Sequence, residues 1–193
     1  MEKERKQRLD LMIDIETLGT NPRTAPIISI SIVDFNPTIE EELHEPMERF
    51  SANLDINASV QFHHRKIDTK TLLWWHEQSL DSFKAALKNP QSPKTAMREM
   101  LEKLDEIAEK NDIYFWCKGI DFDIPMIESY LESCELHSLP YFFSHKYDVR
   151  TLLKIAEMNG WEDTFKDKVT HTAFDDCMLQ IDQARSAIKF LKK

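Results

Sequence analysis

The chain has 193 residues, of which 41% are hydrophobic, and a formal net charge of −9. This length can bury one sizeable core, so we expect a single domain over residues 1–193. No run approaches about 20 apolar residues, which excludes a membrane span. The acidic balance argues against a protein that coats nucleic acid through a basic surface, but not against a metal-dependent nuclease, because bound cations cancel carboxylate charge locally.

The chain begins with the charged segment MEKERKQR, which has no apolar signal core, so we expect no secretion. Its three cysteines, Cys117, Cys134 and Cys177, are far apart and form no disulfide or metal-binding pattern. A reducing cytoplasm is the simplest setting for such a chain.

The first predicted strand covers residues 9–15 and continues to Glu16, because apolar side chains alternate along it. The alternation places Asp14 and Glu16 side by side on one face at the end of the strand. Two carboxylates this close repel, so either one is protonated or a cation lies between them. The alternative is an edge strand with acidic side chains that face solvent.

A turn at residues 18–22 follows, in which Gly19 indicates a special backbone conformation or a close approach of a ligand. Residues 26–35 are rich in β-branched side chains and predict a well-covered strand. A third strand is expected at residues 49–54, and the short connections favour antiparallel pairing. Residues 55–68 are polar, and we expect them to be irregular.

A helix is predicted over residues 69–78, with Asp68 or Thr69 as its N-cap. Trp74 and Trp75 are adjacent, so their side chains point about 100° apart on a helix. One indole can lie in the core while the other reaches a cleft and stacks on a base, or both can lie in the core.

The middle of the chain predicts an amphipathic helix at residues 95–110 and a buried strand at 113–117. The next helix, near residues 122–131, carries Asp123 on its inward face, whereas Asp121 is rotated away. A carboxylate on a buried face requires a partner. Asp123 is therefore either a metal ligand or the N-cap of this helix.

A short segment at residues 147–149 precedes a helix at 150–158, which Gly160 can end, and a polar loop is expected at 161–170. On the last helix the inward stripe contains Cys177, Ile181, Ala184, Ile188 and Leu191.

Two acidic residues on this last helix differ in direction. Relative to the inward stripe Asp175 points to solvent, and Asp176 lies at the edge of the buried face. His171, five residues before Asp176, suits the loop ahead of the helix. It is either a second member of a site there or a capping or core histidine.

Together these residues form a candidate metal site of Asp14, Glu16, Asp123, Asp176 and His171. Carboxylate oxygens favour Mg²⁺ or Mn²⁺ over zinc. Four carboxylates exceed the usual share of one Mg²⁺, so we expect two ions about 4 Å apart. A histidine, which titrates close to neutral pH, can deprotonate an attacking water.

The motifs DIET at residues 14–17, FD at 122–123 and HTAFDD at 171–176 resemble, in order and spacing, the three exonuclease motifs of the DEDDh superfamily. That superfamily includes proofreading exonucleases, ribonuclease T and oligoribonuclease. The segments WWHEQ at 74–78 and YDVRTL at 147–152 resemble a narrower group, the bacterial and phage 3′-5′ exonucleases like phage DexA and the mycobacterial exoribonuclease.

The resemblance implies an α/β, ribonuclease H-like fold, with a mixed central sheet of about five strands flanked by helices. It implies that Asp14, Glu16, Asp123 and Asp176 hold two metal ions and that His171 is the general base.

For the substrate, the resemblance implies that Glu16 and the backbone near Thr17 and Leu18 meet the 3′-terminal nucleotide, with Leu18 wedged against its base. Trp75, Arg150 and Thr151 are then expected to line the substrate channel.

The implied activity is metal-dependent 3′-5′ hydrolysis of single-stranded DNA or RNA with a free 3′ end, to nucleoside 5′-monophosphates. The implied setting is the cytoplasm of a bacterial or phage-infected cell, and related enzymes are often homodimers. The alternatives are an oligoribonuclease-like enzyme on very short RNA and a non-catalytic nucleic-acid-binding module. Two residues depart from the narrower group: Thr172, where it often has Asp, and Asp121, which adds negative charge beside the site.

Overall fold

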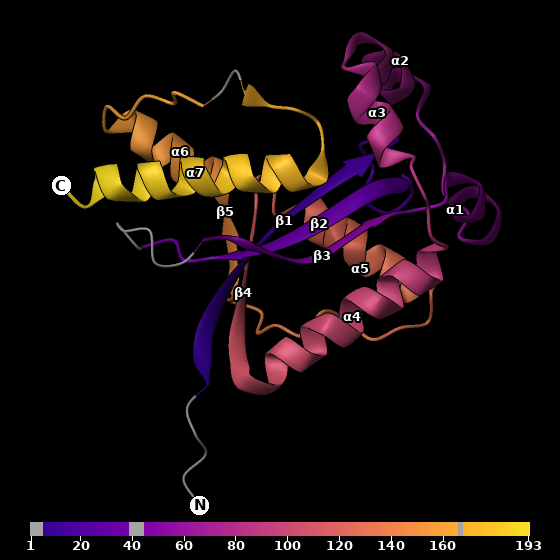
Figure 1. Cartoon of the computed structure of the whole chain (residues 1–193), viewed down its shortest axis with the longest axis horizontal. Helices are drawn as coiled ribbons and strands as arrows, with labels where there is room; N and C mark the ends of the chain where they lie inside the picture. The colour runs from indigo at the N-terminus through magenta and orange to yellow at the C-terminus, as the bar shows by residue number, and fades with distance from the viewer. Residues whose placement is uncertain (1–5, 39–44, 166–167) are drawn as a thin grey trace, which may run out of the picture.

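The computed structural model describes residues 6–38, 45–165 and 168–193. Within them five strands form one sheet in the order β3-β2-β1-β4-β5 (Figure 1). β1 pairs antiparallel with β2, which pairs antiparallel with β3, whereas β1 with β4 and β4 with β5 are parallel. The sheet is therefore mixed, as predicted, and its strands are β1 (Gln7–Thr17), β2 (Ile27–Phe35), β3 (Met47–Asn53), β4 (Asn111–Cys117) and β5 (Lys146–Asp148).

β1 lies at the centre of the sheet because its side chains are apolar on both faces over most of its length. Leu11, Ile13 and Ile15 join the larger core cluster on one face, and Met12 joins a second cluster on the other. The predicted alternation is thus confirmed. Its consequence is that Asp14 and Glu16 share one face where the strand leaves the core.

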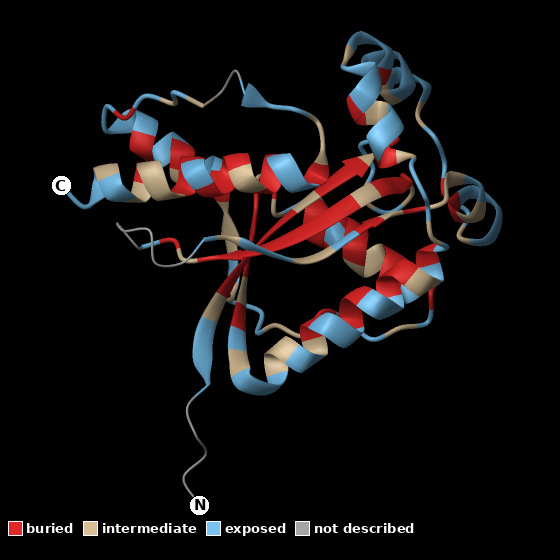
Figure 2. Ribbon diagram, viewed as in Figure 1, coloured by how far each residue is buried: buried red, intermediate tan, exposed pale blue. Residues whose placement is uncertain are grey.

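The helices cover both faces of the sheet (Figure 1). α4 and α5 pack on the face of the larger cluster, and α6 and α7 pack on the opposite face. Figure 2 shows the buried residues concentrated on the sheet and on the helix surfaces that meet it. The bounds of these helices are α4 (Pro93–Lys110), α5 (Asp123–Ser133), α6 (Val149–Met158) and α7 (Ala173–Leu191).

Three shorter helices connect β3 to α4: α1 (Ile56–Phe62), α2 (Thr69–Glu77) and α3 (Leu80–Ala86). α2 was expected, and Asp68 is its N-cap, accepting a hydrogen bond from the amide of Lys70. α1 corrects the expectation that residues 55–68 are irregular. Asp55 caps α1 by accepting a hydrogen bond from the amide of Ala58. This cap stabilises the helix although its sequence is polar.

α2 and α3 form a small unit, here named the α2–α3 hairpin, beside the end of β1 (Figure 1). A third buried cluster of Leu18, Ile28, Trp75 and Ala86 fastens the hairpin to the sheet. The hairpin therefore stands where Asp14 and Glu16 emerge from the core.

The remaining local predictions concern termini and loops. Asn159 ends α6 and Gly160 follows with φ +94°, in the left-handed region. The described residues of the predicted loop at 161–170 form no α-helix or strand, and residues 166–167 lie outside the described part. None of the helices in the described ranges is long and apolar enough to cross a bilayer.

Candidate active site

Four carboxylates converge from three elements. Asp14 and Glu16 come from the end of β1, Asp123 is the first residue of α5, and Asp176 lies in the first turn of α7. Glu16, Asp123 and Asp176 are each less than 9% exposed, and Asp14 is half-buried. Strand alternation and helix phase predicted that these four side chains face the same region.

Helix phase also separates the ligand candidates from their acidic neighbours. Asp176 is buried whereas Asp175 is exposed, and Asp123 is buried whereas Asp121 is exposed. Asp123 is not the N-cap of α5, because Phe122 occupies that position. The capping alternative for Asp123 is therefore excluded.

Burial raises the pKa of all four carboxyl groups in the cluster, and for Asp14 and Glu16 the charges of the neighbouring carboxylates add to the shift. Burial raises the pKa of Glu16 to about 8, with further contributions from Asp176 and Asp123. Burial raises the pKa of Asp123 to about 7, although backbone hydrogen bonds and Arg150 oppose the shift. The pKa of Asp14 is raised well above its usual value, by burial and then by the charges of Asp123, Glu16 and Asp176. Such a set favours protons or cations between the carboxylates.

The donor set fits divalent cations. One ligand atom from each of Glu16, His171 and Asp176 lies within 4.8 Å of the other two. Asp14 and Asp123 lie outside that tight group, but they are coupled electrostatically to each other. Hard oxygen donors dominate this set, which suits Mg²⁺ or Mn²⁺.

His171 lies in the loop directly before α7, where the sequence placed it. Its backbone has φ +58°, in the left-handed region that residues other than glycine rarely adopt. Its ring packs edge-on against Trp74, with ring centroids 4.8 Å apart. The imidazole is thus a member of the site and not a core residue.

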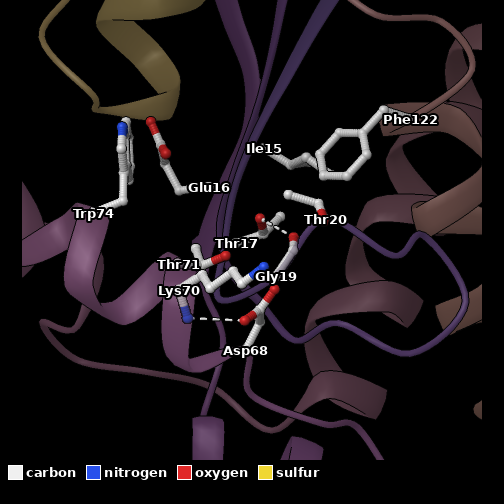
Figure 3. A pocket seen from close by; sticks show the side chains of 10 residues that line it. All are labelled: Ile15, Glu16, Thr17, Gly19, Thr20, Asp68, Lys70, Thr71, Trp74 and Phe122. Atoms are coloured by element: carbon white, nitrogen blue, oxygen red, sulfur yellow. Dashed lines mark hydrogen bonds between the residues drawn. The ribbon is translucent and has the colours of Figure 1, made fainter.

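A pocket of about 460 Å³ opens beside Glu16 (Figure 3). In this view Trp74 lies next to Glu16, and Phe122 lies next to Ile15 on the other side of the strand end. Its lining comes from the end of β1, the turn after it, α2 and the start of α5: Ile15, Glu16, Thr17, Gly19, Thr20, Asp68, Lys70, Thr71, Trp74 and Phe122.

The expected substrate residues near β1 divide between the pocket and the core. Thr17 lines the pocket, and its hydroxyl donates to the carbonyl oxygen of Gly19 at 2.8 Å. Leu18 differs from the expectation: its side chain is 1% exposed and packs in the third cluster, so it does not reach the pocket. The reason is the turn, where the amide of Leu18 donates to the carbonyl of Pro26 and directs the side chain inward.

The two tryptophans of α2 differ in where their side chains lie. Trp75, the expected channel residue, is 2% exposed, and its indole N–H donates to the carbonyl oxygen of Thr17 at 3.0 Å. Trp74 is 39% exposed and lines the pocket instead. Trp75 therefore fixes α2 against the end of β1, and Trp74 presents its ring to the pocket.

Arg150 and Thr151 lie at the start of α6. Both Arg150 and Asp123 face Gly119, since a Cβ added there would lie 3.5 Å from Nη2 of Arg150 and 3.6 Å from Oδ2 of Asp123. Arg150 is exposed beside the carboxylates. Thr151 instead belongs to the helix cap, because its amide and hydroxyl both donate to Asp148.

One feature of the site was not assigned from the sequence. Gln180, buried on α7, donates its side-chain amide to Oδ1 of Asp14 at 2.6 Å. Its position four residues after Asp176, at the same edge of the buried face, was the available signal. Gly19, which the sequence singled out, is required by packing, because a Cβ there would meet that of Ala25 at 2.9 Å. The close approach at Gly19 is therefore that of another side chain in the core.

Comparisons with known proteins agree on the fold. E. coli exonuclease I in complex with a 5cy-dA13 oligonucleotide matches at 12% identity and TM-score 0.64, over 95% of this chain and 41% of that one. The zinc-bound form of its complex with single-stranded DNA matches at 11% identity and TM-score 0.64, over 95% and 41%. The chain thus spans about two fifths of the length of these structures. The likeness confirms the predicted ribonuclease H-like α/β fold.

A sequence comparison identifies the family. No curated protein matches the chain. The family model of the Rv2179c-like 3′-5′ exoribonuclease domain matches residues 9–188, which include every carboxylate of the site and all of the sheet except the first two residues of β1. The chain belongs to the family of Rv2179c-like 3′-5′ exoribonuclease domains.

Proposed function

We propose that the chain, as a 3′-5′ exonuclease of this family, hydrolyses single-stranded nucleic acid from a free 3′ end to nucleoside 5′-monophosphates with two divalent ions, Mg²⁺ or Mn²⁺. One observation carries the proposal. Four carboxylates from β1, α5 and α7 converge beside a pocket that begins at Glu16. A nucleotide in this pocket has its phosphodiester next to the carboxylates.

Asp14, Glu16, Asp123 and Asp176 would hold the ions. When bound, the ions would neutralise the charge that develops on the attacking and leaving oxygens of a phosphodiester. The raised pKa values of Glu16 and Asp123 support this role, because carboxylates that are shielded from water and close together favour protons or cations among them.

The protein side chains have separate roles in the proposed reaction. His171, within 4.8 Å of ligand atoms of Glu16 and Asp176, takes the proton of the attacking water. Thr17 and Trp74 hold the terminal nucleotide in the pocket, and Trp74 offers a stacking surface for its base. Arg150, exposed beside Asp123, binds a backbone phosphate by charge.

A non-catalytic nucleic-acid-binding module is the rival from another class. The paired carboxylates disfavour it, because they repel phosphate unless cations intervene. The family description supports RNA as the substrate, whereas the oligonucleotides in the exonuclease I complexes are DNA. Very short RNA, the substrate of the alternative oligoribonuclease-like enzyme, and a homodimeric state, common among related enzymes, are included in the tests.

The test is digestion of matched DNA and RNA oligonucleotides labelled at the 5′ end, from two nucleotides upward, with Mg²⁺ or Mn²⁺. We expect a ladder that shortens from the 3′ end and is lost with chelator and in Asp14→Ala. Light scattering of the same preparation gives the oligomeric state. Cleavage by Asp14→Ala at the wild-type rate, or tight binding without cleavage by the wild type, would overturn the proposal.

A further inference from the structure

The backbone of His171 requires support from outside its own loop. Its φ of +58° is unfavourable for a side chain with a Cβ and persists only where surrounding contacts impose it. On the α7 side, Asp176 holds the loop: its Oδ1 accepts from the amide of Thr170 at 3.2 Å, and its carboxylate also accepts from the backbone of His171. Further contacts come from the α2–α3 hairpin, which is far away in the sequence.

The first of these contacts is aromatic. The ring of Trp74 meets the imidazole of His171 edge-on, at 81° between the ring planes and 4.8 Å between centroids. Trp75, the next residue, has its indole centroid 6.2 Å from the same imidazole. The imidazole therefore rests against two rings of α2, and these rings limit how far it can swing.

The second contact is a hydrogen bond to the loop backbone. Ser82, on α3 and 8% exposed, donates its hydroxyl to the carbonyl oxygen of Thr170 over 2.6 Å. Thr170 directly precedes His171, so this bond fixes the peptide that enters the left-handed residue. Ser82 does not line the pocket beside Glu16.

The hairpin itself is anchored to the strand that carries two of the carboxylates. Trp75 donates to the carbonyl oxygen of Thr17, the residue after Glu16, at 3.0 Å. The α2–α3 hairpin thus contacts the end of β1 through Trp75, and the His171 loop through Trp74 and Ser82.

We propose that Trp74 and Ser82 are positioning residues that hold His171 in register with the carboxylates, so that the α2–α3 hairpin sets the rate of the chemical step. The proposal rests on the proposed function, in which His171 takes a proton from water. Because Trp74 also lines the pocket, a base stacked on it restrains the same indole that supports His171. Occupation of the pocket and placement of the imidazole are therefore coupled.

Ser82 gives the cleaner test, because it touches the loop but not the pocket. Ser82→Ala removes the hydroxyl, and alanine is well tolerated in a helix. We expect kcat to fall about fivefold, the effect of one neutral hydrogen bond on a rate. The Kd of an oligonucleotide, measured by fluorescence anisotropy with Ca²⁺ in place of Mg²⁺, stays at the wild-type value. Ser82→Thr, which keeps a hydroxyl, restores kcat.

A second set of variants tests Trp74. Trp74→Ala lowers kcat about tenfold and also weakens oligonucleotide binding about tenfold, because it removes both the ring contact and a stacking surface. Trp74→Phe keeps an aromatic ring and recovers most of both quantities. Leu73→Ala is the matched control, since Leu73 is 62% exposed on the same helix and does not line the pocket.

Nuclear magnetic resonance adds a readout that a change in overall stability does not produce. The imidazole signals of His171, assigned by comparison with His171→Gln, carry a ring-current shift from Trp74 that disappears in Trp74→Ala. The proposal is overturned if Ser82→Ala cleaves at the wild-type kcat, or if its loss of kcat is matched by an equal loss of binding. If the wild type itself produces no 3′-5′ ladder, the proposed function has failed instead.

Discussion

Gln180 donates its side-chain amide to Oδ1 of Asp14 over 2.6 Å, which joins α7 directly to the end of β1. Asp176 lies one helical turn earlier on α7, so the same helix supplies a carboxylate and orients another. A hydrogen bond to one oxygen of a carboxylate fixes the direction of the other. Such partners of ligand groups tune metal sites as strongly as some of the ligands themselves.

Replacing Gln180 by the similarly sized Met should therefore weaken Mn²⁺ binding about tenfold, the lower end of the range for partners of metal ligands. Isothermal titration calorimetry measures this without any substrate. Gln183→Met is the matched control, because Gln183 is also buried on α7 but pairs with Lys118 and Asp163 away from the carboxylates. Equal Mn²⁺ affinity in the wild type and Gln180→Met would contradict the role given to the amide.

Asp175 and Asp176 allow a comparison between neighbours. Asp176→Asn should lower kcat at least about a hundredfold, the scale for losing one group that stabilises transition-state charge. Asp175→Asn should stay within about threefold, since Asp175 is exposed and accepts from the hydroxyl of Thr172. Steady-state cleavage of one labelled oligonucleotide decides between them. Similar losses in both variants would show that helix phase does not define the ligand.

The same substitution should have the opposite effect on stability. Burial raises the pKa of Asp176, so its ionised form is unfavourable in the folded chain without cations. In chelator we expect a higher Tm for Asp176→Asn than for the wild type, by differential scanning fluorimetry at pH about 8. In saturating Mg²⁺ the order should reverse, because the wild type gains more binding energy. A lower Tm for the variant in chelator would be inconsistent with repulsion among the carboxylates.

Stability in chelator should also depend on pH in a defined direction. The pKa of Glu16 is about 8 in the folded chain against an ordinary value of 4.5, so the folded state holds its proton more tightly than the unfolded state. The proton on Glu16 therefore adds to the free energy of unfolding. This stabilisation is complete below pH about 4.5 and is lost as the pH rises through about 8. Glu16→Gln should therefore flatten the fall of Tm across this window. An unchanged slope in the variant would contradict the shift.

Arg65 offers a test of how α5 is held. Its guanidinium is 3% exposed and donates to the carbonyls of Arg23 and Ser129, and it stacks on Tyr130 with 3.9 Å between Cζ and the ring centroid. Arg65→Lys keeps a buried charge but loses this fork of donors, so we expect a loss of about 2 kcal/mol in urea unfolding. Arg65→Met, which buries no charge, should lose less. A variant with Lys as stable as the wild type would contradict the importance of the fork.

The parts of the site that follow a regular period could be predicted. Alternation along β1 placed Asp14 and Glu16 on one face, and the helical period distinguished Asp176 from Asp175 and Asp123 from Asp121. In each case the apolar neighbours define which side of the element faces the core, and the direction of the polar side chain follows from its position relative to them. The antiparallel pairing of the first three strands followed from their short connections, whereas the mixed character of the whole sheet was implied by the family resemblance.

Residues outside such periods were harder to place. Leu18 follows the strand in a turn, where no repeat sets the direction of a side chain, and the structure packs it inward. Trp74 and Trp75 are equally apolar, so composition did not decide which one reaches the pocket. The bond between Ser82 and Thr170 joins positions 88 residues apart and left no local signal.

The order of the site along the chain has a consequence for its synthesis. The central strand β1 is made first, but its parallel neighbour β4 begins at Asn111, and Asp176 on α7 comes near the end. A ribosome must therefore release almost the entire domain before the carboxylates can meet. Under the proposed two-ion chemistry, the nascent chain has no complete cleavage site until α7 has emerged from the ribosome.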